Sequence, residues 1–521
     1  MNHLLTLAAA VATQARLNPH KLGARDSHRA LTFAQWHERA TRLANGLLSL
    51  GLAKGDRVAL LAYNCVEWME MYAALARAGL VAVPINFRLT APEIAYIAGH
   101  SEARAFIVQH DLLDRVAPVR GDLPQVLAQG WIHFGTAAPA HWQGYEALIE
   151  GASALPCEMG VQPGDPCALM YTSGTTGRPK GALRSHEGNT LIALATALEM
   201  GFTRDDTALL VMPMCHANSL YFSHTFTHLG ASCVVDDRKS FDPEALLATL
   251  SREKVTFTSL VPTHYIMMLG LPDAVKAQYD VSAVEKLMIS SAPARKDTKL
   301  AILEHFRNGR LYELYGSTEA GWVTLLRPEE QIDKLGSVGR EWAGSGAIRL
   351  LDADGHEVPD GAVGELYSHT PYVFDGYWKS PEKTAEAFRG AWCSVGDMAR
   401  RDADGYITLV DRKSNMIISG GENVYPSEVE SILGAHPQIK DVAVIGVPHD
   451  KWGEAVEAVV VLHVGQQASE RELLDWCRPR MAGYKRPQAI RFIEDPQMPR
   501  TATGKILHRV LRDRLAAQAE H

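Results

Sequence analysis

The feature that most constrains this chain is a repeated alternation of short apolar runs with helical patterns through its first four hundred residues. An apolar run at 57–62 is followed by a helical pattern at 65–78, and Gly79 then precedes a second apolar run at 80–85. Short apolar runs predict buried strands, the glycine predicts a helix C-cap, and this order predicts parallel strands joined by crossover helices. The chain is therefore predicted to have an α/β fold.

The same alternation returns in the middle of the chain. Strands are predicted at 207–213, 232–235, 255–261 and 286–290, with a helix that ends before Gly230. Asp242 and Pro243 are predicted to be the N-cap and the first residue of another helix. These segments predict that one parallel sheet extends over all four strands.

After about residue 345 the pattern changes to short strands separated by turns. The tetrapeptide Asp-Ala-Asp-Gly occurs at 352–355 and again at 402–405. Because glycine accepts positive φ and aspartate bonds to its own backbone, both copies predict hairpin turns.

A further block begins at Glu422, with a helix predicted at 426–433, strands at 441–446 and 455–463, and a helix from Glu470. The polar segment 411–415 is the predicted linker. A chain of 521 residues is longer than one core usually organises. We predict a large amino-terminal domain at 1–411, with parallel-rich sheets, crossover helices and a β-rich subdomain, and a small, mobile α+β domain at 412–521.

Composition excludes several classes of protein. The net charge of −8 argues against a nucleic-acid binder, which needs a basic surface. The seven cysteines are scattered without metal-ligand spacing, and no stretch approaches the ~20 apolar residues that span a bilayer. The apolar stretch 4–12 lacks a preceding basic residue and is interpreted as an ordinary helix. A cytoplasmic protein is expected, and a homo-oligomer is left open.

The most informative motif is the glycine- and hydroxyl-rich loop at 171–181. Its residues are Tyr171, Thr172, Ser173, Gly174, Thr175, Thr176, Gly177, Arg178, Pro179, Lys180 and Gly181. Backbone amides, hydroxyls and two cations on a flexible loop suit a polyphosphate. The loop is not a Walker A motif, because Lys180 precedes Gly181 and stands three residues after Gly177.

This loop resembles the signature of the adenylate-forming superfamily, which includes acyl-CoA synthetases, aryl-CoA ligases, luciferase and adenylation domains. Further segments match that family in its order, at 315–319 (Tyr-Gly-Ser-Thr-Glu), 394–397, 411–412, 419–426 and 499–505. The match to the acyl-CoA synthetase and aryl-CoA ligase branch covers nearly the whole chain.

A strand is predicted to end at Leu314, just before Thr318 and Glu319, and open α/β sheets bind their ligands at such strand ends. The resemblance implies a nucleotide site. It places the ribose at Asp397 with Arg412 nearby, the α-phosphate at Thr318, and Mg²⁺ at Glu319. Carboxylate and phosphate oxygens suit that cation. The resemblance also places Tyr315 and Gly316 in the ATP site, and Ser291, Ala292 and Pro293 in the adenine pocket.

It further implies that Lys505 reaches the α-phosphate and the attacking carboxylate during adenylation. Coenzyme A is implied near Ser419, Gly420, Gly421 and Glu422, together with Arg486. The family's hinge falls on Ser414, where its members more often carry Asp or Lys.

The acid pocket is expected near the segment 213–218, whose His216 resembles the family's histidine beside the acid. Tyr221 and Trp322 are expected to line an apolar, partly aromatic pocket. A satisfied core histidine remains the alternative for His216. His224 and His228 are spaced for a metal but lack a visible third ligand, and Arg184 has no expected role.

These motifs predict an ATP-dependent carboxylic acid–CoA ligase that forms an acyl-adenylate with release of pyrophosphate, then acyl-CoA and AMP. The expected acid is apolar, either fatty, alicyclic or aromatic. An adenylating enzyme with a carrier-protein thiol or another acceptor is the alternative. A P-loop kinase or a nucleotide-binding scaffold without chemistry is the other rival, opposed by the missing Walker lysine and by Lys505.

Overall fold

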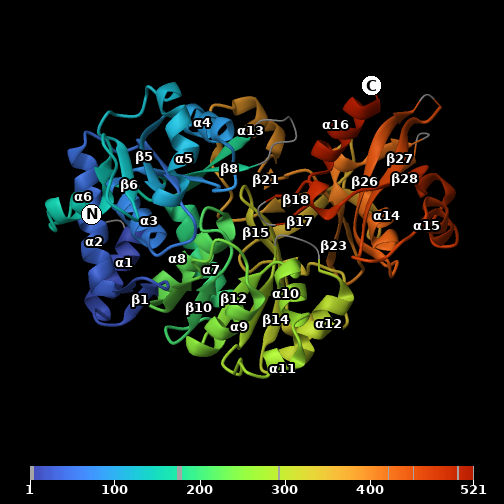
Figure 1. Cartoon of the computed structure of the whole chain (residues 1–521), viewed down its shortest axis with the longest axis horizontal. Helices are drawn as coiled ribbons and strands as arrows, with labels where there is room; N and C mark the ends of the chain where they lie inside the picture. The colour runs from blue at the N-terminus through green and yellow to red at the C-terminus, as the bar shows by residue number, and fades with distance from the viewer. Residues whose placement is uncertain are drawn as a thin grey trace. The chain divides into compact units, whose positions relative to one another are not determined.

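The computed structural model describes residues 5–172, 179–290, 294–419, 422–449, 451–501 and 504–519. The chain divides into two compact units (Figure 1). The first holds residues 1–347 and 368–393, and the second holds 348–367 and 394–521. The domain boundary at 411/412 stays a prediction.

One sheet of the first unit contains the strands predicted in the middle of the chain. Its order is β16-β15-β14-β13-β12-β10-β11-β1-β2, and the strands from β14 to β1 are parallel. The strands are β1 (Leu22–Arg25), β2 (Ala30–Thr32), β10 (Thr207–Leu210), β11 (Ser232–Val235), β12 (Phe257–Leu260), β13 (Lys286–Ile289), β14 (Arg310–Ser317), β15 (Gly321–Leu326) and β16 (Arg340–Glu341).

The other large sheet contains the first predicted pair of strands, which lie side by side in parallel as β3 and β4. Its order is β19-β9-β8-β4-β3-β5-β6-β7. The strands are β3 (Arg57–Leu61), β4 (Val81–Ile85), β5 (Ala103–Gln109), β6 (Trp131–Phe134), β7 (Gln143–Gly144), β8 (Pro166–Thr172), β9 (Lys180–Ser185) and β19 (Gly376–Tyr377). Short strands β20 (Phe388–Arg389) and β21 (Trp392–Cys393) pair with each other.

Helices connect the parallel strands, as the alternation predicts, and their ends follow the predicted capping chemistry. Gly79 and Gly230 adopt φ of 65° and 72° after the third and eighth helices. The Asp242 carboxylate accepts from the amides of Glu244 and Ala245, at 3.0 Å each. The helices are α1 (Leu7–Leu17), α2 (Phe33–Ser49), α3 (Glu67–Ala78), α4 (Ala91–His100), α5 (Leu113–Val116), α6 (Tyr145–Gly151), α7 (His186–Met200), α8 (Ala217–Leu229), α9 (Pro243–Arg252), α10 (Pro262–Leu269), α11 (Asp273–Lys276), α12 (Lys296–His305) and α13 (Pro381–Ala387).

The second unit is rich in antiparallel strands. In one part β22 (Asp397–Arg401) pairs with β23 (Ile407–Arg412) and β18 (Val363–His369), and β17 (Gly346–Leu351) also pairs with β18. In the other, the order is β25-β24-β27-β26, with β28 beside β27. The elements here are β24 (Ile417–Ser419), β25 (Glu422–Val424), β26 (Ile439–His449), β27 (Gly453–Leu462), β28 (Ala489–Phe492), α14 (Pro426–Leu433), α15 (Glu470–Cys477) and α16 (His508–Ala519).

Both Asp-Ala-Asp-Gly segments form the predicted turns. Gly355 and Gly405 have φ of 89° and 86°. The amides of His356 and Tyr406 each donate to the aspartate carboxylate that opens their turn, at 2.9 Å. The predicted fold class, including the β-rich region and the α+β carboxyl-terminal part, is confirmed.

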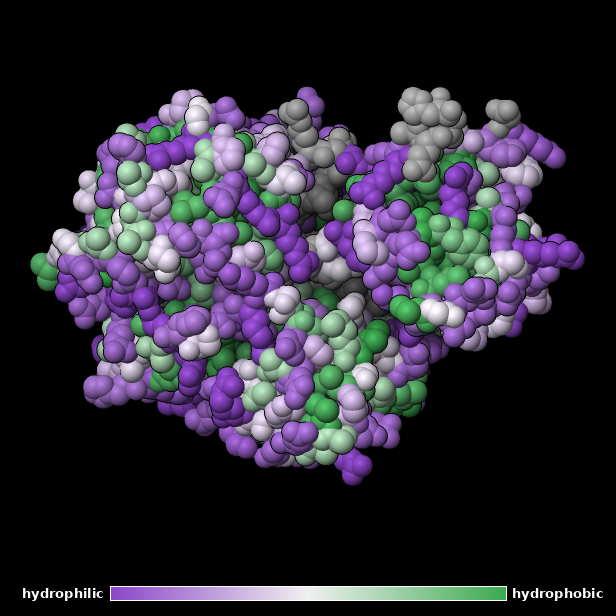
Figure 2. Space-filling view, in the orientation of Figure 1, coloured by the Kyte–Doolittle hydropathy of each residue, from purple (hydrophilic) through white to green (hydrophobic). Residues whose placement is uncertain are grey.

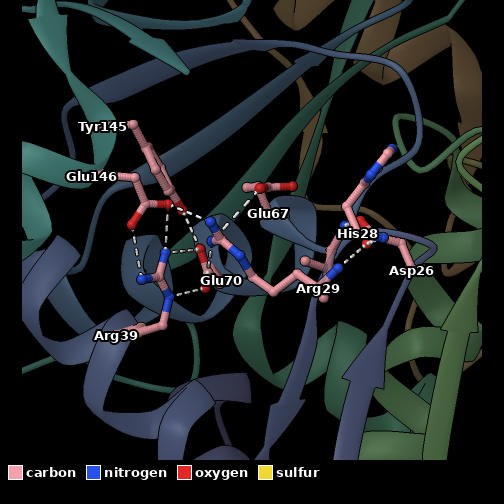
Figure 3. Close-up of polar contacts among 9 residues, drawn as sticks. Asp26, His28, Arg29, Arg39, Glu67, Glu70, Tyr145 and Glu146 are labelled. Atoms are coloured by element: carbon pink, nitrogen blue, oxygen red, sulfur yellow. Dashed lines mark hydrogen bonds and ion pairs between the residues drawn. The ribbon is translucent and has the colours of Figure 1, made fainter. Parts of the chain in front are cut away.

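A buried polar network ties α2, α3 and α6 together in the first unit (Figure 3). Glu70 is fully buried, and its carboxylate pairs with Arg39 and accepts from the Tyr145 hydroxyl at 2.9 Å. Arg39 also donates twice to Glu146, at 2.9 Å each, and Arg29 donates to Glu146 at 2.7 Å. Sequence periodicity carries no sign of this network, because its members are far apart in the chain.

The surface is mostly polar. Figure 2 shows hydrophobic residues gathered over α10 and α12, where Ile266, Met267 and Leu300 are each almost half exposed. Within the described ranges, no helix combines the length and the apolar character needed to cross a bilayer.

Candidate active site

The Thr318–Glu319 motif lies in a tight turn between β14 and β15. The sequence predicted that the strand ends at Leu314, but β14 continues to Ser317 because residues 315–317 pair antiparallel with β15. A Cβ on Gly316 would lie 2.3 Å from the carbonyl oxygen of Gly321, so only glycine fits there. The turn therefore begins three residues later than predicted, directly at the motif.

The Glu319 carboxylate is buried and held by two hydroxyl groups. Its Oε1 accepts from Thr172 Oγ1 at 3.0 Å and from the Tyr377 hydroxyl at 2.9 Å. The Lys180 ammonium lies 4.2 Å from the centre of the Tyr377 ring. The structure thus gathers Thr172, Lys180 and Glu319 around Tyr377, which sequence reasoning missed because a single tyrosine between short strands has no recognisable spacing.

Several predicted site residues lie outside the described part of the chain. They are Ser173, Gly174, Thr175, Thr176 and Gly177 of the phosphate loop, Ser291, Ala292 and Pro293 of the adenine turn, and Gly420 and Gly421 of the coenzyme A segment. Their roles stay predictions.

The expected acid-pocket residues lie on α8 and at the start of β15. Tyr221 and Trp322 are buried, and their rings meet edge to face with centroids 5.1 Å apart. Trp322 Nε1 donates to Thr196 Oγ1 at 2.9 Å, which satisfies the buried indole. This contact brings two of the three predicted pocket residues together.

His216 caps the amino-terminal end of α8 with its backbone, without a side-chain hydrogen bond to the helix. Burial, followed by the positive charge of Arg88, lowers the pKa of His216 to about 4. The imidazole is therefore neutral at pH 7. Its Nε2 is shielded from solvent and makes no hydrogen bond to any residue that the structure describes.

In the second unit, Asp397 and Arg412 are cross-strand partners on β22 and β23. Arg412 Nε lies 2.6 Å from Asp397 Oδ1. Lys505 is close enough to both that their charges act on it, although the residue as a whole is exposed. Burial, and then the charge of Arg412, lower the pKa of the Lys505 ammonium. Three residues predicted to contact the nucleotide are thus gathered in this unit.

The loop that carries Lys505 has a defined local structure. The Thr501 amide donates to the Lys505 carbonyl at 2.7 Å, and the Lys505 amide donates to Thr501 Oγ1 at 3.1 Å. Gly504 takes a φ of 83°, which favours glycine. Helix α16 begins only at His508, because Ile506 pairs with Arg500 as a β-bridge.

The remaining predicted residues have ordinary local surroundings. Ser414 is exposed in a short 3₁₀ turn, and Ser419 and Glu422 are opposed across the β24–β25 hairpin. Arg486 Nε and Nη2 donate to the carbonyl oxygens of Met481 and Arg478, at 3.3 and 3.1 Å. Their hinge and coenzyme A roles stay predictions.

His224 and His228 lie one turn apart on α8, with His224 buried and His228 partly buried. Among the described residues, the group of three or more possible metal ligands whose ligand atoms all lie within 4.8 Å of one another is Asp352, Asp354 and His356, all exposed on a turn. Burial lowers the pKa of His224 to about 3 and that of His228 to about 4. Both imidazoles are neutral at pH 7.

These buried histidines predict acid sensitivity. In the unfolded chain the two imidazoles are protonated near pH 6.5, whereas in the folded chain they stay neutral down to about pH 4. Their stabilisation is therefore full above pH 6.5 and is lost as the pH falls toward 4, by about 3 kcal/mol for each histidine. Urea unfolding midpoints measured between pH 7.5 and 5 should fall steadily.

The variant His224→Gln supplies the control for that measurement. It removes one of the protons taken up on unfolding, so its midpoint should depend less steeply on pH than that of the unaltered protein. Parallel curves for the two proteins would contradict this account of the buried histidine.

Comparison with known proteins agrees with this geometry. Residues 11–378 match the AMP-binding enzyme family, and residues 428–505 match the AMP-binding enzyme C-terminal domain. A feruloyl-CoA synthase of Amycolatopsis sp is 38% identical over 96% of this chain and 97% of its own length. An indoleacetate–CoA ligase of Aromatoleum aromaticum is 34% identical, covering 94% of each chain.

A solved structure of an anthranilate CoA ligase in complex with anthranoyl-AMP superimposes with a TM-score of 0.90. It is 29% identical and covers 99% of this chain and 98% of that chain. The match along both units, together with relatives above 30% identity, settles the family. The chain belongs to the AMP-binding enzyme family and is an AMP-forming acid–thiol ligase of the acyl-CoA synthetase branch.

Proposed function

We propose that this enzyme joins a compact, ring-bearing apolar carboxylic acid to coenzyme A. In the first step a carboxylate oxygen attacks the α-phosphorus of ATP, and pyrophosphate leaves. In the second step the thiolate of coenzyme A attacks the acyl carbonyl, and AMP leaves. No protein nucleophile is needed, so positioning and electrostatics supply the catalysis.

The arrangement around Glu319 is the observation that carries the proposal. Thr172 and Lys180 flank the predicted phosphate loop, and both lie with Glu319 around Tyr377. The contacts that Glu319 makes to these hydroxyls use Oε1. We propose that the Glu319 carboxylate would hold Mg²⁺, a hard cation that prefers carboxylate and phosphate oxygens. Bound there, Mg²⁺ would neutralise phosphate charge.

We propose that Thr318 contacts the α-phosphate and that Asp397 and Arg412 hold the ribose. Lys505 is proposed to stabilise charge on the α-phosphate and the incoming carboxylate during adenylation. Supporting this, the charges of Arg412 and Asp397 act on the Lys505 ammonium, and burial lowers its pKa. Ser414 is proposed as the hinge between the two steps, and Ser419, Glu422 and Arg486 as coenzyme A contacts.

The size of the acid is inferred from the rings near the expected pocket. Trp322 packs against Tyr221 and Phe222, and Trp342 lies 6.2 Å from it. We take these four neighbouring rings to favour a ring-bearing acid over a long chain. Relatives named for feruloyl-CoA and indoleacetate support a ring-bearing acid. We propose that His216 borders the acid as a neutral imidazole.

A pyrophosphate-release assay over a panel of acids tests the proposal. Cinnamic-type and arylacetic acids should release pyrophosphate faster than a saturated long-chain acid, and coenzyme A should convert the product to a thioester. Preference for the long-chain acid would overturn the proposed acid class. Thioester formation only on a carrier-protein thiol would overturn coenzyme A as acceptor.

Replacement of Trp322 by glycine tests the pocket. Trp322→Gly removes the indole and its hydrogen bond to Thr196, so bulkier acids should gain in kcat/KM relative to small aromatic acids, by about tenfold. The KM for ATP should change by less than about twofold. Steady-state kinetics with two acids of different size measure both values. An equal loss of ATP and acid binding would place Trp322 in the nucleotide site or the core.

We also propose a cytoplasmic location. All seven cysteines are free thiols, which suits a reducing compartment.

A further inference from the structure

Arg184 is an unusual residue because it places a permanent charge inside the first unit. It lies on β9, four residues after Lys180, and only 1% of it is exposed. An arginine cannot lose its charge in a protein, and a buried charge without a partner costs several kcal/mol. Across the described ranges, no carboxylate oxygen lies within ion-pair distance of Arg184; its charge acts on the Asp375 carboxylate, and its guanidinium lies 5.5 Å from the centre of the Tyr221 ring. Its position therefore needs another explanation.

The guanidinium of Arg184 instead donates to main-chain carbonyls of the catalytic turn. Its Nη1 is shared between the carbonyl oxygens of Thr318, at 3.4 Å, and Glu319, at 3.3 Å. Its Nε donates to Asn189 Oδ1 at 3.3 Å, and Asn189 Nδ2 in turn lies 3.1 Å from Cys167 Sγ. Asn189 of α7, which itself contacts Cys167 of β8, thus helps to orient the guanidinium, whose Nη2 makes no hydrogen bond to a described residue.

The hydrogen bonds from Arg184 to the carbonyls of Thr318 and Glu319 connect the two large sheets of the first unit. Thr318 and Glu319 follow β14 of one sheet, whereas Arg184 lies on β9 of the other. The Glu319 side chain is held by the second sheet through Thr172 and Tyr377. Its main chain is held by Arg184 and by the Phe374 amide, at 2.7 Å. Because peptide groups are planar, carbonyls held in this way set where the two side chains point.

We propose that Arg184 is a positioning residue that orients the Thr318 hydroxyl and the Glu319 carboxylate against the strands that flank the phosphate loop. The inference rests on the proposed function of Thr318 and Glu319. Arg184 itself touches neither substrate nor the reacting atoms in this account. It acts through the turn, and its positive charge strengthens its hydrogen bonds to the two carbonyl oxygens.

The test is a double-mutant cycle between Arg184→Met and Glu319→Gln in the full chain. Methionine keeps much of the side-chain volume but donates no hydrogen bond. Pyrophosphate release in Arg184→Met should fall by about 10²-fold in kcat, the scale of a small misplacement, with the acid KM changed by less than about twofold. The Mg²⁺ concentration for half-maximal rate should rise several-fold. The double variant should be no slower than Glu319→Gln alone, because both changes remove one function.

The controls separate positioning from stability. Lys286 is another buried cation of this unit, 3% exposed and 3.3 Å from Asp206. Lys286→Met should lower the thermal midpoint and leave the kcat of the folded protein near that of the unaltered enzyme. If Arg184→Met does not fold, Arg184→Lys replaces it. A lysine that reaches only one carbonyl should lose about three- to tenfold, again without adding to Glu319→Gln.

The outcomes are distinguishable. If the unaltered enzyme releases no pyrophosphate with any acid, the proposed function fails. If the unaltered enzyme does release pyrophosphate, two results would overturn the positioning role of Arg184. One is full kcat in the Arg184 variant that folds. The other is a double variant that is slower than Glu319→Gln by the whole factor that the Arg184 change costs alone.

Discussion

Replacing Lys505 with alanine should lower the rate of acyl-adenylate formation by at least about 10²-fold, the usual result of losing one donor that stabilises transition-state charge. The charges of Arg412 and Asp397 act on the Lys505 ammonium, and alanine leaves no cation in its place. The second step should survive, because the thiol attacks a carbonyl that AMP has already activated. Single-turnover pyrophosphate release, and thioester formation from a supplied acyl-adenylate, measure the two steps.

Lys440 offers the matched control in the same unit. It is an exposed lysine paired with Asp495 at 2.8 Å, a surface ion pair of the kind that contributes little to stability. Lys440→Ala should leave both steps unchanged. A Lys505→Ala enzyme that loses both steps equally would show that the lysine has no specific part in adenylation.

The second large effect is expected on stability, at the buried network of Figure 3. Arg39→Met removes the main cationic partner of Glu70, whose side chain has no exposed surface. Breaking a buried ion pair from one side costs about 3–5 kcal/mol, because it leaves an uncompensated charge. Arg29 remains, but its nearest contact with the Glu70 carboxylate is 3.7 Å. Equilibrium urea unfolding should show this loss as a lower midpoint.

The neighbouring residue supplies the control. Glu38→Gln removes only an i,i+4 pair with Arg42, in which 56% of the glutamate side chain is exposed, and should cost less than about 1 kcal/mol. Adding Glu70→Gln to Arg39→Met should restore part of the lost stability, because the stranded charge disappears. If Arg39→Met and Glu38→Gln destabilise equally, the network does not act as a buried ion cluster.

Much of the fold could be predicted from local chemistry. The strand at 232–235 and the helix at 426–433 have the predicted bounds, and the glycine caps and Asp-Ala-Asp-Gly turns form as expected. These features depend on neighbours within a few residues, where φ preferences, capping and apolar period act directly. The prediction that this strand ends at Leu314 was wrong, because pairing with β15, a tertiary contact, extends β14 to Ser317.

In the candidate site, too, local features could be predicted from the sequence and contacts between distant residues could not. The sequence alone determined the family, the order of the motifs, and which hydroxyls, carboxylates and cations are available for phosphate chemistry. Only the tertiary structure decided that Glu319 lies against Thr172, 147 residues away, that Tyr377 joins them, and that Arg184 holds their turn. A side-chain contact between two sheets depends on how strands that are distant in the sequence align in space. No local sequence pattern encodes that alignment.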